Sequence, residues 1–411
     1  MIQYERFFLE NGLEVIIHTD KSTPLITVNT LYKVGSRDER PDKTGFAHLF
    51  EHLMFEGSEN VDDFDEELEK AGGENNAFTS NDITNYYITL PAPNIETALW
   101  IESDRMKSLS INQEALDIQK NVVIEEFKEH YINQPYGDTW HLLSALAYKT
   151  HPYRWPTIGI DISHVADAKL DTVQDFFDTY YVPNNAILVL AGNIEKEDAK
   201  KLVEKWYGDI PKGKDIHRNI PIEEKQVAAR KLIHSADVPV NYIYKAYKMC
   251  NRMDKNYQAI DLISDILGSG DSSRLTQKLV KEKNIFSTIN AYVTGTLDEG
   301  LFVIDAKIAD GISVESADEA IVNLLDEFCA TPISEYELQK VKNQIESYNE
   351  LNDIDILNRA TNLAYYSYMG DVDFINTEIN QYLSLTPEII QAQAKQLFNK
   401  EYCNTLWYLK G

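Results

Sequence analysis

The second half of this chain repeats the order of strands and helices found in the first half, and this recurrence constrains the fold more than any other feature. In the first half, β-branched segments predict strands at 13–18, 25–33, 74–80, 84–91 and 186–191, and amphipathic segments predict helices at 64–70, 95–108, 113–133 and 196–207. In the second half, the same criteria predict strands at 240–247, 288–293, 300–308 and 403–409 and a helix at 257–267. The two halves are therefore expected to be structural duplicates.

A polar, charged stretch around 211–230 interrupts the pattern between these halves. Such a stretch is typical of a linker. We therefore expect a first domain at 1–212, a linker at 213–228 and a second domain at 229–411, which suits a chain of 411 residues.

Composition and apolar run lengths predict the cellular compartment of the protein. Its longest apolar runs are too short to span a bilayer, and its first residues lack the pattern of a secretory signal. The 3 cysteines are odd in number and widely spaced, which is typical of core thiols in a reducing compartment. These features predict a cytoplasmic protein without a membrane partner.

The chain is strongly acidic, with a net charge of −27. Nucleic-acid binding requires a basic face, so no nucleic-acid partner is expected. Two interpretations of the charge remain open. It forms a solvated surface that keeps the protein dispersed, or it lines an interior that attracts basic peptides.

One short segment carries residues suited to metal chemistry. His48-Leu49-Phe50-Glu51-His52 reads H-x-x-E-H. On a helix, positions four apart share a face, so the imidazoles of His48 and His52 can converge on one metal ion. Glu51 borders this face as a candidate base, and zinc lowers the pKa of a bound water to roughly 7. The segment supplies two ligands and a base, and it lacks a third ligand.

An exposed helix with these residues by chance is the alternative. The flanking residues are apolar and predict a buried helix, where histidine and glutamate are rarely left without a partner or a metal. A third ligand should lie far along the chain. The apolar-faced helix around 119–130 carries Glu125, Glu126 and Glu129, although an ordinary charged face explains any one of them.

Several short segments, spread nearly end to end, match one family in its own order. They are 45–57, 72–80, 121–126, 151–153 with 158–159, 181–185, 272–275 and 406–409. On these segments the chain resembles the M16 metallopeptidases (pitrilysins or inverzincins), in the short two-domain branch that includes bacterial processing-protease-like proteins and mitochondrial processing peptidase subunits. The resemblance implies an α+β fold of two homologous halves, each a mainly antiparallel sheet covered by helices (the LuxS/MPP-like metallohydrolase type).

The resemblance also implies an activity and its residues. It predicts a zinc endopeptidase that cleaves short or unfolded peptides inside a chamber, with Glu51 as the catalytic base. The family's third zinc ligand maps to Glu126, although Glu129 fits a longer spacing by count. Many members carry a supporting glutamate seven residues earlier, where this chain has Gln119. The strand containing Asn76, Ala77 and Phe78 would pair with the substrate backbone by β-augmentation; without the family, Asn76 reads as a turn residue.

The second half departs from the family. Active relatives place an arginine and, seven residues on, a tyrosine there to hold the substrate, and these positions hold Val280 and Ser287 here. A shifted alignment would give these roles to Arg274 and Tyr292 instead. Because some members divide the labour between two chains, the departure predicts a heterodimer with a homologous chain that lacks zinc, or else a homodimer. The competing hypotheses are a non-catalytic interaction subunit, which commonly loses the zinc motif, and a structural zinc protein, which would not leave an open coordination position.

Overall fold

The computed structural model describes residues 1–411, and the chain divides into two compact units. The first unit comprises Met1–Lys128, Trp155–Ile220 and Glu350–Asn376, and the second comprises Glu129–Arg154, Pro221–Asn349 and Thr377–Gly411. Each unit therefore includes one segment from the other half of the sequence. The compact units are thus discontinuous in sequence. The division into contiguous domains at 1–212 and 229–411 stays a prediction.

The first unit is built on a six-stranded sheet of order β1-β2-β6-β3-β5-β4. The strands are β1 (Glu5–Phe8), β2 (Glu14–Thr19), β3 (Leu25–Tyr32), β4 (Glu74–Thr79), β5 (Thr84–Pro91) and β6 (Ala186–Gly192). Only β2 and β6 pair in parallel. Strand β6 is buried along its whole length, as expected of a central strand covered on both faces. Strand β4 lies at the edge of the sheet.

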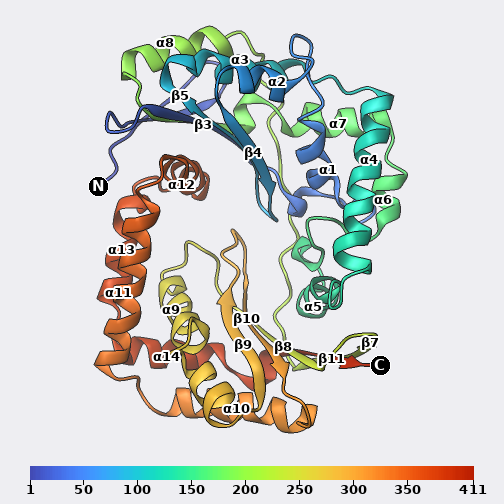
Figure 1. Ribbon diagram of the computed structural model, residues 1–411, viewed down its shortest axis with the longest axis vertical. Coiled ribbons are helices and arrows are strands. Elements are labelled where there is room, and N and C mark those ends of the chain that lie inside the picture. Colours follow the sequence, from blue (N-terminus) through green and yellow to red (C-terminus); the bar gives the residue numbers. More distant parts are fainter. The chain divides into compact units, whose positions relative to one another are not determined.

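Helices cover both faces of this sheet (Figure 1). The helices of this unit are α1 (Phe46–Leu53), α2 (Phe64–Lys70), α3 (Ile95–Ser108), α4 (Gln113–Phe127), α6 (Ile162–Ala166), α7 (Leu170–Tyr180), α8 (Lys196–Tyr207) and α12 (Ile356–Met369). Helices α3 and α8 pack on one face, and α12 packs on β6, β3 and β2 from the opposite face. Helix α12 buries Ala360, Leu363 and Ala364 against Val189 of the sheet.

The second unit is built on a five-stranded sheet of order β7-β11-β8-β10-β9. The strands are β7 (Arg230–Ala236), β8 (Tyr242–Lys248), β9 (Phe286–Val293), β10 (Leu301–Ile308) and β11 (Cys403–Lys410). Only β7 and β11 pair in parallel. The helices are α5 (Thr139–Ala147), α9 (Tyr257–Gly268), α10 (Val314–Ala330) and α14 (Pro387–Leu397). Helices α11 (Glu335–Asn352) and α13 (Phe374–Ser384) lie mostly in this unit and cross its boundaries.

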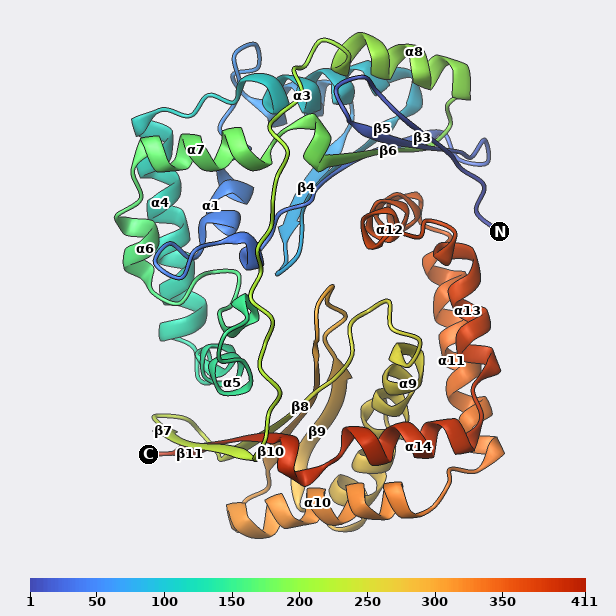
Figure 2. The same cartoon turned by 180° about the vertical axis from the view of Figure 1, so that it is seen from behind.

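Helices also cover both faces of the second sheet (Figure 2). Helices α9 and α10 pack on one face, over a large apolar core that includes Ile263, Phe302 and Phe328. Helix α5 packs on β11, β8 and β7, over a second, aromatic-rich core. Because helices pack on both faces of each sheet, both sheets contain apolar residues on both faces.

The two sheets have the same topology, because the spatial order β2-β6-β3-β5-β4 of the first sheet corresponds strand for strand to the order β7-β11-β8-β10-β9 of the second. The mainly antiparallel α+β duplicates expected from the sequence are confirmed. The exchanged helices also match: α12 contacts β6, β3 and β2, and α5 contacts the equivalent β11, β8 and β7. Neither exchange was predicted.

Local differences from the sequence-based expectations are small. The helix expected at 113–133 ends as an α-helix at Phe127 and continues as a π-helical turn at Lys128–Ile132. No helix combines the length and the apolar character needed to cross a membrane. A cytoplasmic location stays a prediction.

Candidate metal centre

Helix α1 carries the H-x-x-E-H segment, and apolar contacts fix its orientation. Its buried residues include Phe46, Leu49 and Phe50. The ring of Phe50 stacks on Phe176 of α7 at 5.0 Å and on Tyr181 at 5.1 Å between centroids. Because this face is held inside the unit, His48, Glu51 and His52 are left half-buried on the other side.

A buried carboxylate holds the first turn of α1. Oε2 of Glu39 accepts a hydrogen bond from the Gly45 N–H at 3.0 Å, and Oε1 accepts one from the Ala47 N–H at 2.8 Å. These N–H groups have no partner within the helix, so Glu39 acts as its cap. Burial raises the pKa of Glu39 to about 8, against the lowering effect of these hydrogen bonds. Sequence reasoning missed Glu39, because an acidic residue in a loop carries no local signal of capping at a distance.

Gly45 allows the close approach at this end of the helix. Its φ of 86° lies in the left-handed region, and a Cβ there would lie 2.7 Å from the carbonyl oxygen of Ile158. Both conditions exclude other residues without strain. The glycine before the motif is therefore required by the backbone as well as by the family pattern.

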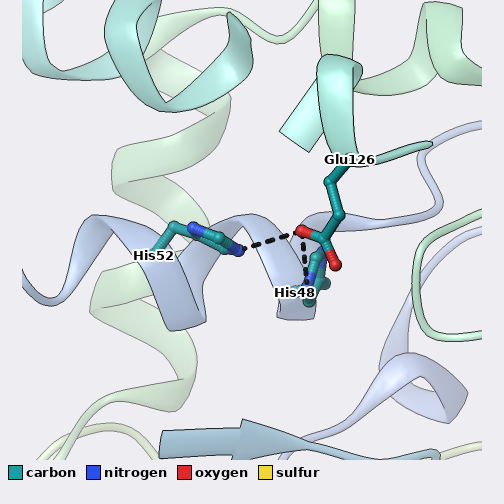
Figure 3. A group of neighbouring side chains, drawn as sticks. All are labelled: His48, His52 and Glu126. Carbon is teal, nitrogen blue, oxygen red and sulfur yellow. Dashed lines mark ion pairs between the residues drawn. The ribbon is translucent and has the colours of Figure 1, made fainter. Parts of the chain in front are cut away.

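Helix α4 brings Glu126 to the two histidines. The ligand-type atoms of His48, His52 and Glu126 all lie within 4.8 Å of one another. Figure 3 shows both imidazoles on α1 directed toward the Glu126 carboxylate, which descends from α4. Oε2 of Glu126 lies 3.6 Å from Nε2 of His48 and 3.4 Å from Nε2 of His52.

These distances fit a tetrahedral metal site. Two ligand atoms that are each about 2.0–2.2 Å from a tetrahedral zinc ion lie about 3.3–3.6 Å from each other. Two imidazole nitrogens and one carboxylate oxygen are also the donor set of many catalytic zinc sites, and three protein ligands leave a position open. The residues present therefore fit zinc.

The electrostatics of the cluster favour the metal-binding form of His48. Burial lowers the pKa of His48, the neighbouring His52 lowers it further, and the carboxylates of Glu126 and Glu51 oppose the shift. A neutral imidazole is the form that binds a metal. Nδ1 of His48 is buried without a hydrogen-bond partner, so the contact that usually orients a ligand histidine is absent here.

The other candidate residues of this segment lie away from the two histidines or make other contacts. Glu125 is exposed and pairs with Lys128 at 2.7 Å. Glu129 is exposed on the π-helical turn and is not part of the ligand group. Gln119 donates a hydrogen bond to Glu56, and its own Oε1 is buried without a partner. At position 119, where many family members carry a glutamate, a neutral amide side chain therefore contacts Glu56, which follows the H-x-x-E-H helix.

The predicted substrate strand is β4, which pairs with β5 on one side only. Asn76 and Phe78 are exposed on it and Ala77 is half-buried, so Asn76 is a strand residue and not a turn residue. The Asn76 side chain accepts a hydrogen bond from the Ala77 N–H at 2.8 Å. Strand β4 also packs beside α1.

The second unit contains the positions at which this chain lacks the arginine and tyrosine of the family pattern. Val280 lies in the π-helical segment Thr276–Glu282 and packs against the core, and Ser287 is exposed on edge strand β9. Arg274 makes two hydrogen bonds to Glu337, at 2.8 and 2.7 Å. This pairing already uses the guanidinium fork that a substrate carboxylate or carbonyl would need.

Comparisons with known proteins find similarity along nearly the whole chain. The family model "Insulinase (Peptidase family M16)" matches residues 14–159, and "Peptidase M16 inactive domain" matches residues 167–345. The chain is 30% identical to the zinc protease PqqE of Helicobacter pylori, over 99% of this chain and 93% of that protein. The crystal structure of a protease from Helicobacter pylori matches with a TM-score of 0.94 and 30% identity, over 99% of this chain and 100% of that one. The probable mitochondrial-processing peptidase subunit beta of Arabidopsis thaliana is 25% identical, over 82% of this chain and 65% of that protein.

Proposed function

Because the chain belongs to the peptidase M16 family, we propose that it is a zinc-dependent endopeptidase that cleaves short or unfolded peptides. The observation that carries the proposal is the convergence of His48, His52 and Glu126 on one point, with Glu51 on the same helix. The relatives named zinc proteases support the same activity.

In this proposal the site residues have two separate roles, metal binding and proton transfer. His48, His52 and Glu126 hold the metal, which when bound supplies Lewis-acid chemistry that polarises a peptide carbonyl and acidifies water. Glu51 accepts a proton from the attacking water and passes it to the leaving amine nitrogen, which is general base and then general acid catalysis. Its position one residue before His52 keeps its carboxylate at the border of the ligand face.

Edge strand β4 supports the choice of substrate. Its free side can pair with one extended segment, in which Asn76, Ala77 and Phe78 lie alongside the peptide. The hydrogen bond between the Asn76 side chain and the Ala77 N–H would have to open, so that this donor can reach a substrate carbonyl. A folded protein cannot present such a segment without unfolding locally, which favours short or unfolded peptides.

The substrate-holding residues of the second unit support a requirement for a partner. Val280 is apolar and Ser287 is short, and Arg274 is already paired. We therefore expect a second, homologous chain to supply an arginine and tyrosine pair, in a heterodimer or, less favoured by these residues, a homodimer. The same observation supports the alternative function, a non-catalytic or weakly active subunit of a processing complex.

Metal analysis together with cleavage of a quenched fluorescent peptide tests the activity. We expect Glu51→Gln to retain zinc and to lose about 100-fold or more in kcat, as removal of a general base does. Glu126→Gln should lose zinc, and Glu125→Gln, which changes the exposed neighbouring carboxylate, should retain both zinc and activity. Cleavage by Glu51→Gln at the wild-type rate would exclude the proposed base.

The partner is tested in the same assay. The wild-type chain alone should cleave slowly, and a homologous chain with the arginine and tyrosine should restore the rate. Full activity of the isolated chain would exclude the heterodimer. Zinc binding without cleavage, alone or with such a partner, would favour the non-catalytic subunit.

A further inference from the structure

A buried tyrosine hydroxyl holds the peptide bond that leads into Glu51. The hydroxyl of Tyr86, on β5, donates a hydrogen bond to the carbonyl oxygen of Phe50 at 3.2 Å. That carbonyl belongs to the peptide unit between Phe50 and Glu51, and it also accepts the Met54 N–H at 3.1 Å. The Tyr86 side chain is fully buried, so the contact is shielded from water.

The Tyr86 ring is itself held in place by a buried cation. The guanidinium of Arg105 lies 4.4 Å from the ring centroid, and the ring of Tyr32 meets it edge-on at 5.9 Å. Arg105 is 3% exposed and forms an ion pair with Glu102, whose side chain is 0% exposed. The cation–π contact is strong in such a site, because water does not compete for the cation.

This buried polar group is costly for the fold. Oε2 of Glu102, Nε of Arg105 and the hydroxyl of Tyr32 are all buried without a hydrogen-bond partner. Unpaired polar atoms of this kind are rare in native structures, and each lowers stability. A buried ion pair is also often no more stabilising than an apolar pair of the same volume. The group is therefore better explained by what it holds than by its contribution to stability.

The charge of Glu51 lies within electrostatic reach of this group. Burial raises the pKa of Tyr86 well above its ordinary value, and the Glu51 carboxylate adds to the shift. Burial likewise raises the pKa of Tyr181, with a further contribution from Glu51. Tyr181 stacks on the ring of Phe50, and its hydroxyl lies near those of Tyr86 and Thr84 and makes no hydrogen bond to the Phe50 carbonyl.

We propose that Tyr86, held by Arg105 and Glu102, is a positioning residue that sets the orientation of Glu51 relative to the metal ligands. The proposal rests on the peptidase function proposed above. With the hydroxyl in place, the Phe50–Glu51 peptide unit cannot rotate, and the Glu51 side chain leaves the helix in one direction. Without it, the turn gains freedom at the residue that must reach the attacking water within hydrogen-bond distance.

The variants Tyr86→Phe and Tyr181→Phe form a matched pair. Each removes one buried hydroxyl near Phe50, but only the Tyr86 hydroxyl donates a hydrogen bond to the Phe50 carbonyl. In Tyr86→Phe we expect about a tenfold lower kcat with unchanged KM and zinc content, which corresponds to the loss of one hydrogen bond. In Tyr181→Phe we expect wild-type kcat. Equal kcat in the two variants, or a change in KM alone, overturns the proposal.

Amide hydrogen exchange tests the same contact without relying on activity. The Met54 N–H shares the Phe50 carbonyl with Tyr86, so it should exchange faster in Tyr86→Phe than in Tyr181→Phe. Equal exchange overturns the proposal even if the enzyme is active. If the zinc-loaded wild type cleaves no peptide but the exchange rates differ, the proposed function fails, whereas the hold of Tyr86 on α1 stands. Arg105→Lys keeps the charge but not the planar stack, and it should lower kcat less than Tyr86→Phe does.

Discussion

Replacing Leu363 by alanine tests the assignment of α12 to the first unit, although its sequence belongs to the second half. Leu363 is fully buried, and its neighbours in the core include Val189 and Ala191 of β6. Three carbon atoms are lost, at about 0.8 kcal/mol for each buried methylene, which gives about 2.4 kcal/mol. The cavity left behind raises the expected loss to about 3–4 kcal/mol.

Hydrogen exchange measured by mass spectrometry localises this loss. We expect peptides from β3 and β6 to exchange faster in Leu363→Ala, and peptides from β8 and β11 to exchange at the wild-type rate, because α12 covers only the first sheet. Leu351→Ala is the control, since this leucine is 67% exposed and its loss should change stability by less than about 0.5 kcal/mol. Faster exchange in β8 and β11 alone, or no change anywhere, would refute the assignment.

Three further predictions concern carboxylates that are buried or half-buried. Burial alone would raise the pKa of Glu223, but hydrogen bonds from the backbone N–H groups of 149–151 lower it to about 2. A lowered pKa stabilises the fold above the ordinary value of 4.5, so Glu223→Gln should cost about 2 kcal/mol at pH 7, and the difference from the wild type should shrink as the pH falls from 4.5 toward 2. Burial, together with the charge of Asp261, raises the pKa of Asp265 to about 6. The stabilisation it gives is present below pH 3.8 and is lost as the pH rises through about 6, so Asp265→Asn should be more stable than the wild type at pH 8, and this advantage should decrease toward pH 4. Glu39→Ala should lower the stability of the first unit by about 1–2 kcal/mol and weaken zinc binding, because two N–H groups at the start of α1 lose their acceptor.

Urea unfolding at several pH values checks the first two of these predictions, and competition with a chromogenic chelator checks the third. A Glu223→Gln difference that stays constant from pH 7 to pH 2 would contradict the assigned hydrogen bonds. A pH-independent difference in Asp265→Asn would contradict the raised pKa. Glu10→Ala is the control for Glu39, since Glu10 is exposed at a turn. Equal zinc affinity in Glu39→Ala and Glu10→Ala would show that the cap does not support the metal centre.

The local structure of this chain follows closely from its sequence. The helices expected at 64–70, 95–108 and 196–207 have those bounds in the structure, and the strand at 186–191 is extended by one residue. Periodicity in apolar residues decides these elements, because each buries a face that the sequence itself marks. The H-x-x-E-H helix is of the same kind, since the spacing of four places both imidazoles on one side.

The third ligand shows where sequence reasoning needed more than periodicity. Spacing alone allowed Glu126 or Glu129, and the family pattern selected Glu126. The structure places Glu126 next to the histidines and Glu129 on an exposed turn of different pitch. The change from an α-helix to a π-helix after Phe127 depends on packing, and nothing in the sequence of 128–132 marks it.

The sequence by itself therefore determined the elements, the duplication and the two-ligand helix, because these depend on residues that are close in the chain. Only the tertiary structure decided the exchange of α5 and α12 between the units, since an amphipathic helix specifies an apolar face and not which of two equivalent sheets will cover it. It also decided the contacts of Glu39 and Tyr86 with α1. The sequences around Glu39 and Tyr86 give no indication that these residues contact α1. The contacts form because a loop and strand β5 pack against that helix.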